Sequence, residues 1–209
     1  MQPETKVKYA ALAVFFVTAW FSIGHNKPDE HFQILEFAQY KLGLIDVADL
    51  PWEFNARIRS AIQPWLALIF IKSLHLVHVT NPFTIALIMR LFSALLLWAV
   101  MYRLSVALRQ KYFHDRMWAD LFYYSSFFVW FVPYLCVRFS SENYSTFFLL
   151  LALLFLTVDS KTYRNLGLAG TFLGFSALFR YQLAIPAAGI FLWLLIVARV
   201  PVRRVLISA

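Results

Sequence analysis

The chain has 209 residues, 61% of them hydrophobic and only 14% charged, whereas a soluble domain is roughly 45–50% apolar and about 25% charged. This composition excludes an ordinary soluble protein and indicates a single membrane domain over residues 1–209. The formal net charge of +8 does not predict a nucleic-acid partner, because most basic residues stand in short runs beside apolar segments, where they signal topology and attract membrane lipids.

The apolar segments predict about six transmembrane helices, since a spanning helix needs roughly 20 apolar residues. The first is interpreted as a retained signal anchor, because basic residues precede it and no clear cleavage site follows it. Histidines, a lysine and flanking prolines in the segment 62–79 favour a helix that lies in the outer interface or re-enters it. The predicted spans are 8–24, 83–102, 118–137, 144–158, 166–179 and 183–198.

Basic residues set the orientation of these spans. The start of the chain, the loops 103–116 and 159–164, and the C-terminal tail are rich in lysine and arginine. The positive-inside rule therefore predicts cytoplasmic N- and C-termini in a bacterial inner membrane or an endoplasmic reticulum membrane. A true crossing by 62–79 would instead place the basic loop 103–116 outside. With six crossings, the loop 25–61 faces the periplasm or the lumen.

The outer loop 25–61 is predicted to contain an amphipathic helix over 29–42. A proline just before this segment is typical of a helix start, and apolar residues recur at helical spacing along it. The polar face, which includes Gln33 and Glu36, is expected to turn to water while the other face lies on the membrane.

Three clusters of polar and charged residues reach the same predicted outer face. Ionisable groups at a membrane boundary are costly unless they are paired or hydrated, so their convergence indicates a site. The first cluster also has a purely structural explanation. The positive end of the helix dipole favours acidic residues at the start of a helix, whether or not they have a function. An isolated arginine in the second span, Arg90, is expected to snorkel outward or to pair with an outer-face acid. The clusters are Asp29-Glu30, Arg138 to Asn143, and Arg180 to Gln182.

Four short blocks of sequence form a pattern: Pro28 to Gln33 with Glu36; Trp52 to Phe54 with Ile58 to Ser60 and Pro64; Arg138 to Asn143; and Phe179 to Gln182. This pattern resembles the GPI-anchor and dolichol-linked-oligosaccharide mannosyltransferases, which have the GT-C membrane fold. The resemblance covers the chain from about Val7 to Ala198. The first two blocks are fairly specific, and the later two are weak when taken alone.

The resemblance implies an all-α polytopic membrane protein, a GT-C-like bundle of about six transmembrane helices plus outer-face juxtamembrane helices. It also implies inverting transfer of a sugar from a polyprenyl-phosphate donor to a glycan or lipid acceptor on the outer face. Mannose as the sugar comes from the resemblance alone. The first-loop aspartate of this family is regarded as the catalytic acid/base group, and it corresponds to Asp29, with Glu30 beside it as a second candidate.

The chemistry of this transfer suggests roles for further residues. A carboxylate has to take the proton of the acceptor hydroxyl, and cations have to stabilise the departing phosphate. Guanidinium groups suit that second task, and Glu36 is a further candidate for orienting sugar hydroxyls. We expect no cofactor and no metal site. The candidates for binding the substrate and its phosphate are His31, Gln33, Arg57, Arg59, Glu142 and Arg180.

Members of the resembled family usually run considerably longer. The chain is therefore expected to be a naturally short member or the catalytic part of a truncated or split protein that needs a missing second half or a partner subunit. The residue before the Pro-Asp-Glu block is Lys27, where many relatives carry histidine. The alternative function is an inactive fragment or accessory membrane subunit that binds lipid-linked sugar or a partner protein.

Overall fold

The computed structural model describes residues 3–24, 27–28, 30–58, 60–158 and 162–204, and within these ranges all regular structure is helical, as predicted. The elements are α1 Pro3–Phe21, η1 Glu30–Leu35, α2 Glu36–Lys41, η2 Val47–Asp49, α3 Trp52–Ala56, α4 Ile62–Leu76, α5 Pro82–Tyr112, α6 Arg116–Phe128, α7 Phe131–Cys136, α8 Ser141–Val158, α9 Tyr163–Phe179, η3 Tyr181–Leu183 and α10 Ala184–Ile196.

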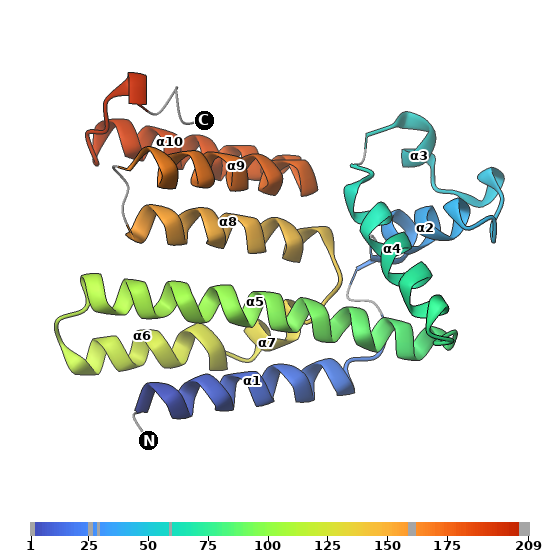
Figure 1. Ribbon diagram of the computed structural model, residues 1–209, viewed down its shortest axis with the longest axis horizontal. Helices are drawn as coiled ribbons and strands as arrows, with labels where there is room; N and C mark the ends of the chain where they lie inside the picture. The colour runs from blue at the N-terminus through green and yellow to red at the C-terminus, as the bar shows by residue number, and fades with distance from the viewer. Residues whose placement is uncertain (1–2, 25–26, 29, 59, 159–161, 205–209) are drawn as a thin grey trace.

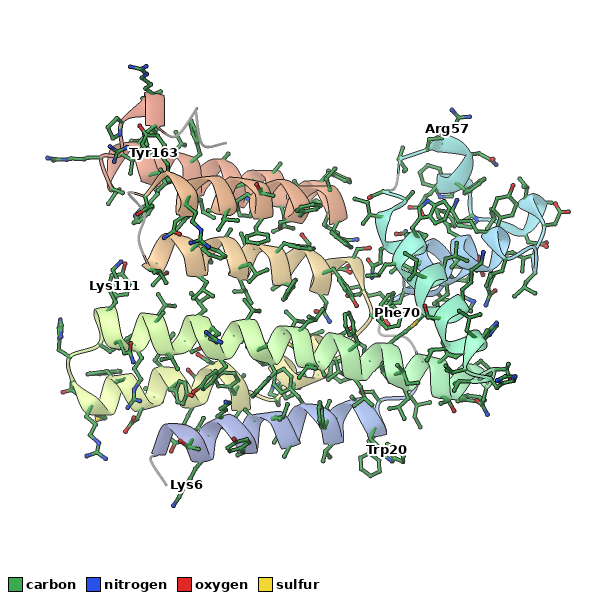
Figure 2. The ribbon with its side chains drawn as sticks, in the orientation of Figure 1. Lys6, Trp20, Arg57, Phe70, Lys111 and Tyr163 are labelled. Atoms are coloured by element: carbon green, nitrogen blue, oxygen red, sulfur yellow. The ribbon has the colours of Figure 1, made fainter. Side chains whose placement is uncertain are left out.

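The long helices run lengthwise beside one another, with α1 against α5, α5 against α8, α8 against α9, and α9 against α10 (Figure 1). The helices α2, α3 and α4 gather at one end of this bundle, and α4 is tilted relative to it. The start of α1, the α5–α6 turn and the end of α8 lie at the opposite end, where Lys6 and Lys111 are found (Figure 2). The predicted topology requires the basic segments to lie at one end of the bundle, and the described parts of these segments do. The side of the membrane that this end faces stays a prediction.

Among the described residues, two helices are long and apolar enough to cross a membrane, α5 and α8. With 31 residues at about 1.5 Å each, α5 is roughly 46 Å long and exceeds the ~30 Å hydrocarbon core of a bilayer. These two helices correspond to the predicted spans 83–102 and 144–158. The helix α4 is apolar but shorter. The other four predicted crossings, and the interfacial placement of 62–79, stay predictions.

The predicted span 118–137 is wrong as a single helix, because the structure divides it into α6 and α7. The backbone turns extended at Val129, with φ −65° and ψ 125°. Pro133 follows four residues later, and a proline in a helix interior clashes with the carbonyl of the residue four positions before it. Val129 occupies that position, so the helix ends before the clash can arise.

The predicted amphipathic helix over 29–42 is found as a π-helical turn, η1, continued by α2. Its polar face is not fully turned to water, since Gln33 is only 8% exposed and Glu36 is half-buried. The Nε2 atom of Gln33 donates a hydrogen bond of 2.8 Å to Oε2 of Glu53 in α3, and aromatic rings of α2 and α3 pack edge to face. The polar face is buried because α3 folds back onto it, a contact that helical periodicity does not reveal.

The helices α8 and α9 are locked together near the end of the bundle that faces α4. Ser145 Oγ donates to the carbonyl oxygen of Ser176 at 2.7 Å, and Ser176 Oγ donates back to the carbonyl oxygen of Ser145 at 2.8 Å. Small side chains let helices in a membrane approach closely. Next to this pair, Tyr144 and Phe148 of α8 stack on Phe179 at the end of α9. The end of α9 is thereby fixed beside the start of α8.

Candidate active site

Three segments that are distant in the sequence meet at the end of the bundle beside α4. Glu142 Oε1, in the first turn of α8, lies 3.1 Å from Nζ of Lys27 and 2.8 Å from Nη2 of Arg180. Nη1 of Arg138 donates a 2.9 Å hydrogen bond to the carbonyl oxygen of Gly24. The structure thus brings described residues of the three predicted clusters to one end of the bundle, and whether this end is the outer membrane face stays a prediction. Asp29 itself lies outside them.

Glu142 is the residue that joins the three segments. Its position in the first turn of α8 suits a negative charge, because the N-terminal end of a helix is partly positive. One carboxylate oxygen accepts from two cations, one on the chain after α1 and one just after α9. Glu142 therefore holds Lys27 and Arg180 in place, in addition to the predicted role in binding the substrate.

Arg138 is buried just before α8, with only 4% of its surface exposed. Its guanidinium lies over the ring of Tyr134, 4.7 Å from the ring centroid. The amide of Asn143 donates to the carbonyl oxygen of Arg138 at 2.6 Å and fixes the turn that carries it. The Nε atom of Arg138 has no hydrogen-bond partner in the part of the chain that the structure describes. A buried guanidinium with an unused donor is suited to an anionic ligand, because burying it without a counter-charge is costly.

A first cavity of about 570 Å³ begins beside these charges and runs between α5, α6, α7 and α8. One end of it is polar and is lined by Lys27, Glu30, Arg138 and Glu142. The remaining walls are mainly apolar side chains of the four helices. The first cavity thus offers charged groups at one end and an apolar channel behind them, an arrangement that matches a molecule with an anionic head and a hydrocarbon chain.

A second cavity of about 320 Å³ shares Glu30 and Arg138 with the first. The two side chains therefore form a common wall between the cavities. The other walls of the second cavity come from α4, from α5 and from the segment around α2, and they include Gln39, His75 and Arg90. A buried carboxylate and a buried guanidinium thus face both spaces.

Arg90, in the first third of α5, points toward this common wall. Its Nε atom donates a 3.1 Å hydrogen bond to the carbonyl oxygen of Ala19 in α1. Its positive charge interacts favourably with Glu30 and unfavourably with Arg138. The hydrogen-bond partner of Arg90 among the described residues is thus a backbone carbonyl, and its predicted pairing with an acid stays a prediction.

The other predicted site residues lie apart from the two cavities. His31 Nε2 is 3.4 Å from Oε1 of Glu36, and neither His31 nor Gln33 lines either cavity. Arg57 ends α3 with a left-handed φ of 52°, is exposed, and points away from the bundle (Figure 2). Arg59 lies outside the described residues. The predicted grip of Arg57 on a phosphate is therefore not supported by its position.

The structure adds Lys27, Arg90 and Arg138 to the predicted site residues. The signal for Arg138 was present in the sequence, because it begins one of the blocks that carry the family resemblance. A signal for Arg90 was its isolation in an apolar helix. Lys27 had no comparable signal. Among the described residues, no group of three His, Cys, Asp or Glu side chains is placed to hold a metal ion.

Comparison with known proteins identifies the family of the chain. Searches of the curated proteins and of the solved structures gave no significant match. The sequence profile of the Alg9-like mannosyltransferase family, by contrast, matches residues 7–207, which is nearly the whole chain. Glycosyltransferase activity is thus the general activity that the match supports. On this match, the chain belongs to the Alg9-like mannosyltransferase family.

Proposed function

We propose that the protein transfers a mannosyl group from a polyprenyl-phosphate donor to a hydroxyl of a glycan or lipid acceptor, on the outer face of the membrane and with inversion. The observation that carries the proposal is the first cavity, which is charged at one end and mainly apolar along four helices. The polyprenyl chain occupies the apolar part, and the phosphate with its sugar occupies the end lined by Lys27, Glu30 and Arg138.

In the proposed reaction, the acceptor hydroxyl attacks the anomeric carbon as the bond from that carbon to the phosphate oxygen breaks. Polyprenyl phosphate leaves, and a carboxylate takes the proton of the hydroxyl. By the family resemblance this base is Asp29. Lys27 and Arg138 stabilise the charge on the departing phosphate. Of the predicted candidates for this task, Arg57 points away from the bundle and His31 lines neither cavity, while Arg59 lies outside the described residues.

The acceptor is proposed to approach through the second cavity. Inversion requires the attacking hydroxyl and the leaving phosphate to lie on opposite sides of the anomeric carbon. Two cavities that share the wall formed by Glu30 and Arg138 support such an arrangement, because a sugar placed at this wall is accessible from both. Glu30 is 6% exposed and adjacent in sequence to Asp29, so it is a candidate for orienting sugar hydroxyls.

Sugar transfer from labelled polyprenyl-phosphate mannose, measured in membranes that contain the protein, tests the proposal. Replacing the base should reduce the transfer rate by about 10² or more in Asp29→Asn, the low end for loss of a general base. The matched control is Asp49→Asn, an exposed acid in the same loop, which should leave the rate unchanged. Equal rates in wild type and Asp29→Asn would place the chemistry on another residue.

A lack of transfer by correctly inserted wild-type protein would instead favour the alternative function of an accessory or inactive subunit. A measurement of donor binding then distinguishes an accessory subunit from an inactive fragment. An accessory subunit that holds the lipid-linked sugar should still bind labelled donor, and Lys27→Met should weaken that binding, because a phosphate would lose a charge-assisted hydrogen bond.

A further inference from the structure

The end of α1 is held by an arginine of another helix. The last four carbonyl groups of an α-helix have no partner within the helix, and Ala19 belongs to this group because α1 ends at Phe21. Thr18 O accepts from the backbone N–H of Ser22, whereas Ala19 O accepts from Nε of Arg90. A cation is favoured at this end of a helix, where the dipole is negative. The contact therefore gives a partner both to a free carbonyl and to a half-buried guanidinium.

A second arginine holds the same stretch of chain five residues later. After α1 the backbone turns at Gly24, whose φ of +70° is a left-handed conformation that glycine adopts without strain. The carbonyl oxygen of Gly24 accepts from Nη1 of Arg138 at 2.9 Å. Two guanidinium groups thus hold the chain on both sides of the point where it leaves α1. The acidic pair at 29–30 begins five residues beyond Gly24.

The two contacts are linked to the acidic pair by charge as well as by the chain. Arg90 is attracted by Glu30 and repelled by Arg138, and all three line the second cavity. The position of the chain after α1 and the charge balance at the common wall therefore depend on the same guanidinium.

We propose that Arg90 is a positioning residue for sugar transfer: by binding the carbonyl oxygen of Ala19 it fixes the end of α1, from which the chain continues towards Glu30, against α5. The proposal rests on the proposed function. Catalytic groups lose much of their effect when they are displaced by about 1 Å, because reaction requires close alignment. Loss of the Arg90 contact should consequently slow the transfer step more than it weakens donor binding.

Kinetics of transfer from labelled polyprenyl-phosphate mannose test this role. In Arg90→Met, which keeps an unbranched apolar side chain but no charge or donor, kcat should fall by about 10- to 100-fold while the donor KM stays close to wild type. Arg90→Lys keeps a charge and a donor and should restore part of the loss. A wild-type kcat in Arg90→Met, or a change confined to KM, overturns the proposal.

The matched control is Trp98→Phe. Trp98 also lies on α5 and also donates a side-chain N–H to a carbonyl of α1, that of Lys8, at 3.2 Å. It acts near the other end of α1, away from the acidic segment. This variant should keep kcat and KM. A comparable loss of kcat in Trp98→Phe would mean that any weakening of α1 against α5 slows transfer, and it would overturn a specific role for Arg90.

Hydrogen exchange separates this inference from the proposed function, because it requires no activity. The peptide covering residues 17–31 should exchange faster in Arg90→Met than in wild type or in Trp98→Phe. Faster exchange together with an inactive wild-type protein would retain the structural role of Arg90 and remove the sugar-transfer proposal. Unchanged exchange in Arg90→Met overturns the positioning role whatever the activity.

Discussion

Glu142 holds two cations with one carboxylate, and its removal should have two separable effects. In Glu142→Ala, Lys27 and Arg180 each lose a charge-assisted contact with a carboxylate, so the free energy of unfolding should fall by about 1–3 kcal/mol. Sugar transfer should also fall, since Lys27 is no longer held at the polar end of the first cavity. Unfolding in detergent and the transfer assay measure the two effects.

Asp120 provides the control for this prediction. It too contacts two cations, Arg109 at 2.7 Å and Arg116 at 3.8 Å, but its pairs lie near the α5–α6 turn, at the far end of the bundle. Asp120→Ala should lower the stability to a comparable or smaller degree and leave transfer at the wild-type rate. If the two variants lost transfer equally, stability alone would account for the effect of Glu142.

Membership of a recognisable block did not by itself place a residue at the cavities, since His31 and Gln33 of the first block line neither. Glu142 and Arg180, from the two weaker blocks, were predicted and lie 2.8 Å apart. Arg57 was chosen because guanidinium groups bind phosphate, yet residue chemistry does not reveal the direction of a side chain, and Arg57 points away. Asp29 lies outside the described residues, so its catalytic role stays a prediction.

At the scale of whole elements, the pairing of α8 with α9 positions Glu142 and Arg180 and can be tested by a double-mutant cycle. Ser145 and Ser176 are almost completely buried and donate to each other's carbonyl groups. Ser145→Ala and Ser176→Ala should each cost about 0.6–1.7 kcal/mol, the range found for hydrogen bonds between membrane helices. Because the two residues are in contact, their effects should be non-additive by at least about 0.5 kcal/mol.

Thr157→Val is the control for the cycle. The hydroxyl of Thr157 bonds to Leu153 within α8 and does not reach α9. Combining this change with Ser176→Ala should give additive losses of stability. Additivity between Ser145 and Ser176 as well would show that their reciprocal hydrogen bonds contribute no coupling between the helices.

Helices could be predicted where hydropathy alone determines their extent. They were harder to predict where local backbone geometry or tertiary contacts determine where a helix ends or which face is buried. The helices α5 and α8 were expected from their apolar length. The break between α6 and α7 was not predicted, because a hydropathy window ignores the effect of Pro133 on the backbone. The proline itself was visible in the sequence. The burial of Gln33 depends on α3, which is close to α2 in space and is joined to it by an irregular segment.

For the whole molecule, the orientation in the membrane is the prediction with the widest consequences. With Cys136, the one cysteine of the chain, replaced by alanine, a cysteine at Ala48 should react with an impermeant thiol reagent in intact cells. A cysteine at Gln110 should react only after permeabilisation. Both positions are exposed and lie at opposite ends of the bundle. The reverse labelling pattern would place the site on the cytoplasmic face.

The meeting of three distant segments was predictable because topology alone brings their ends to one face. The two cavities were not predictable, since their shape depends on how α5, α6, α7 and α8 pack. No local pattern in the sequence specifies the space that remains between helices. The sequence thus predicted Glu30, Glu142 and Arg180, whereas Lys27, Arg90 and Arg138 and the spaces that a substrate would occupy emerged from tertiary packing.

The wall shared by the two cavities implies thermodynamic linkage between their ligands. Arg138 has one guanidinium, and an anion that engages it from the first cavity changes the field in the second. Coupling of this kind is reciprocal: the factor by which one ligand alters the affinity of the other is the same in both directions. On the proposed function, departure of polyprenyl phosphate after transfer would remove the anion from Arg138, so release of one product and retention of the other would become parts of a single equilibrium.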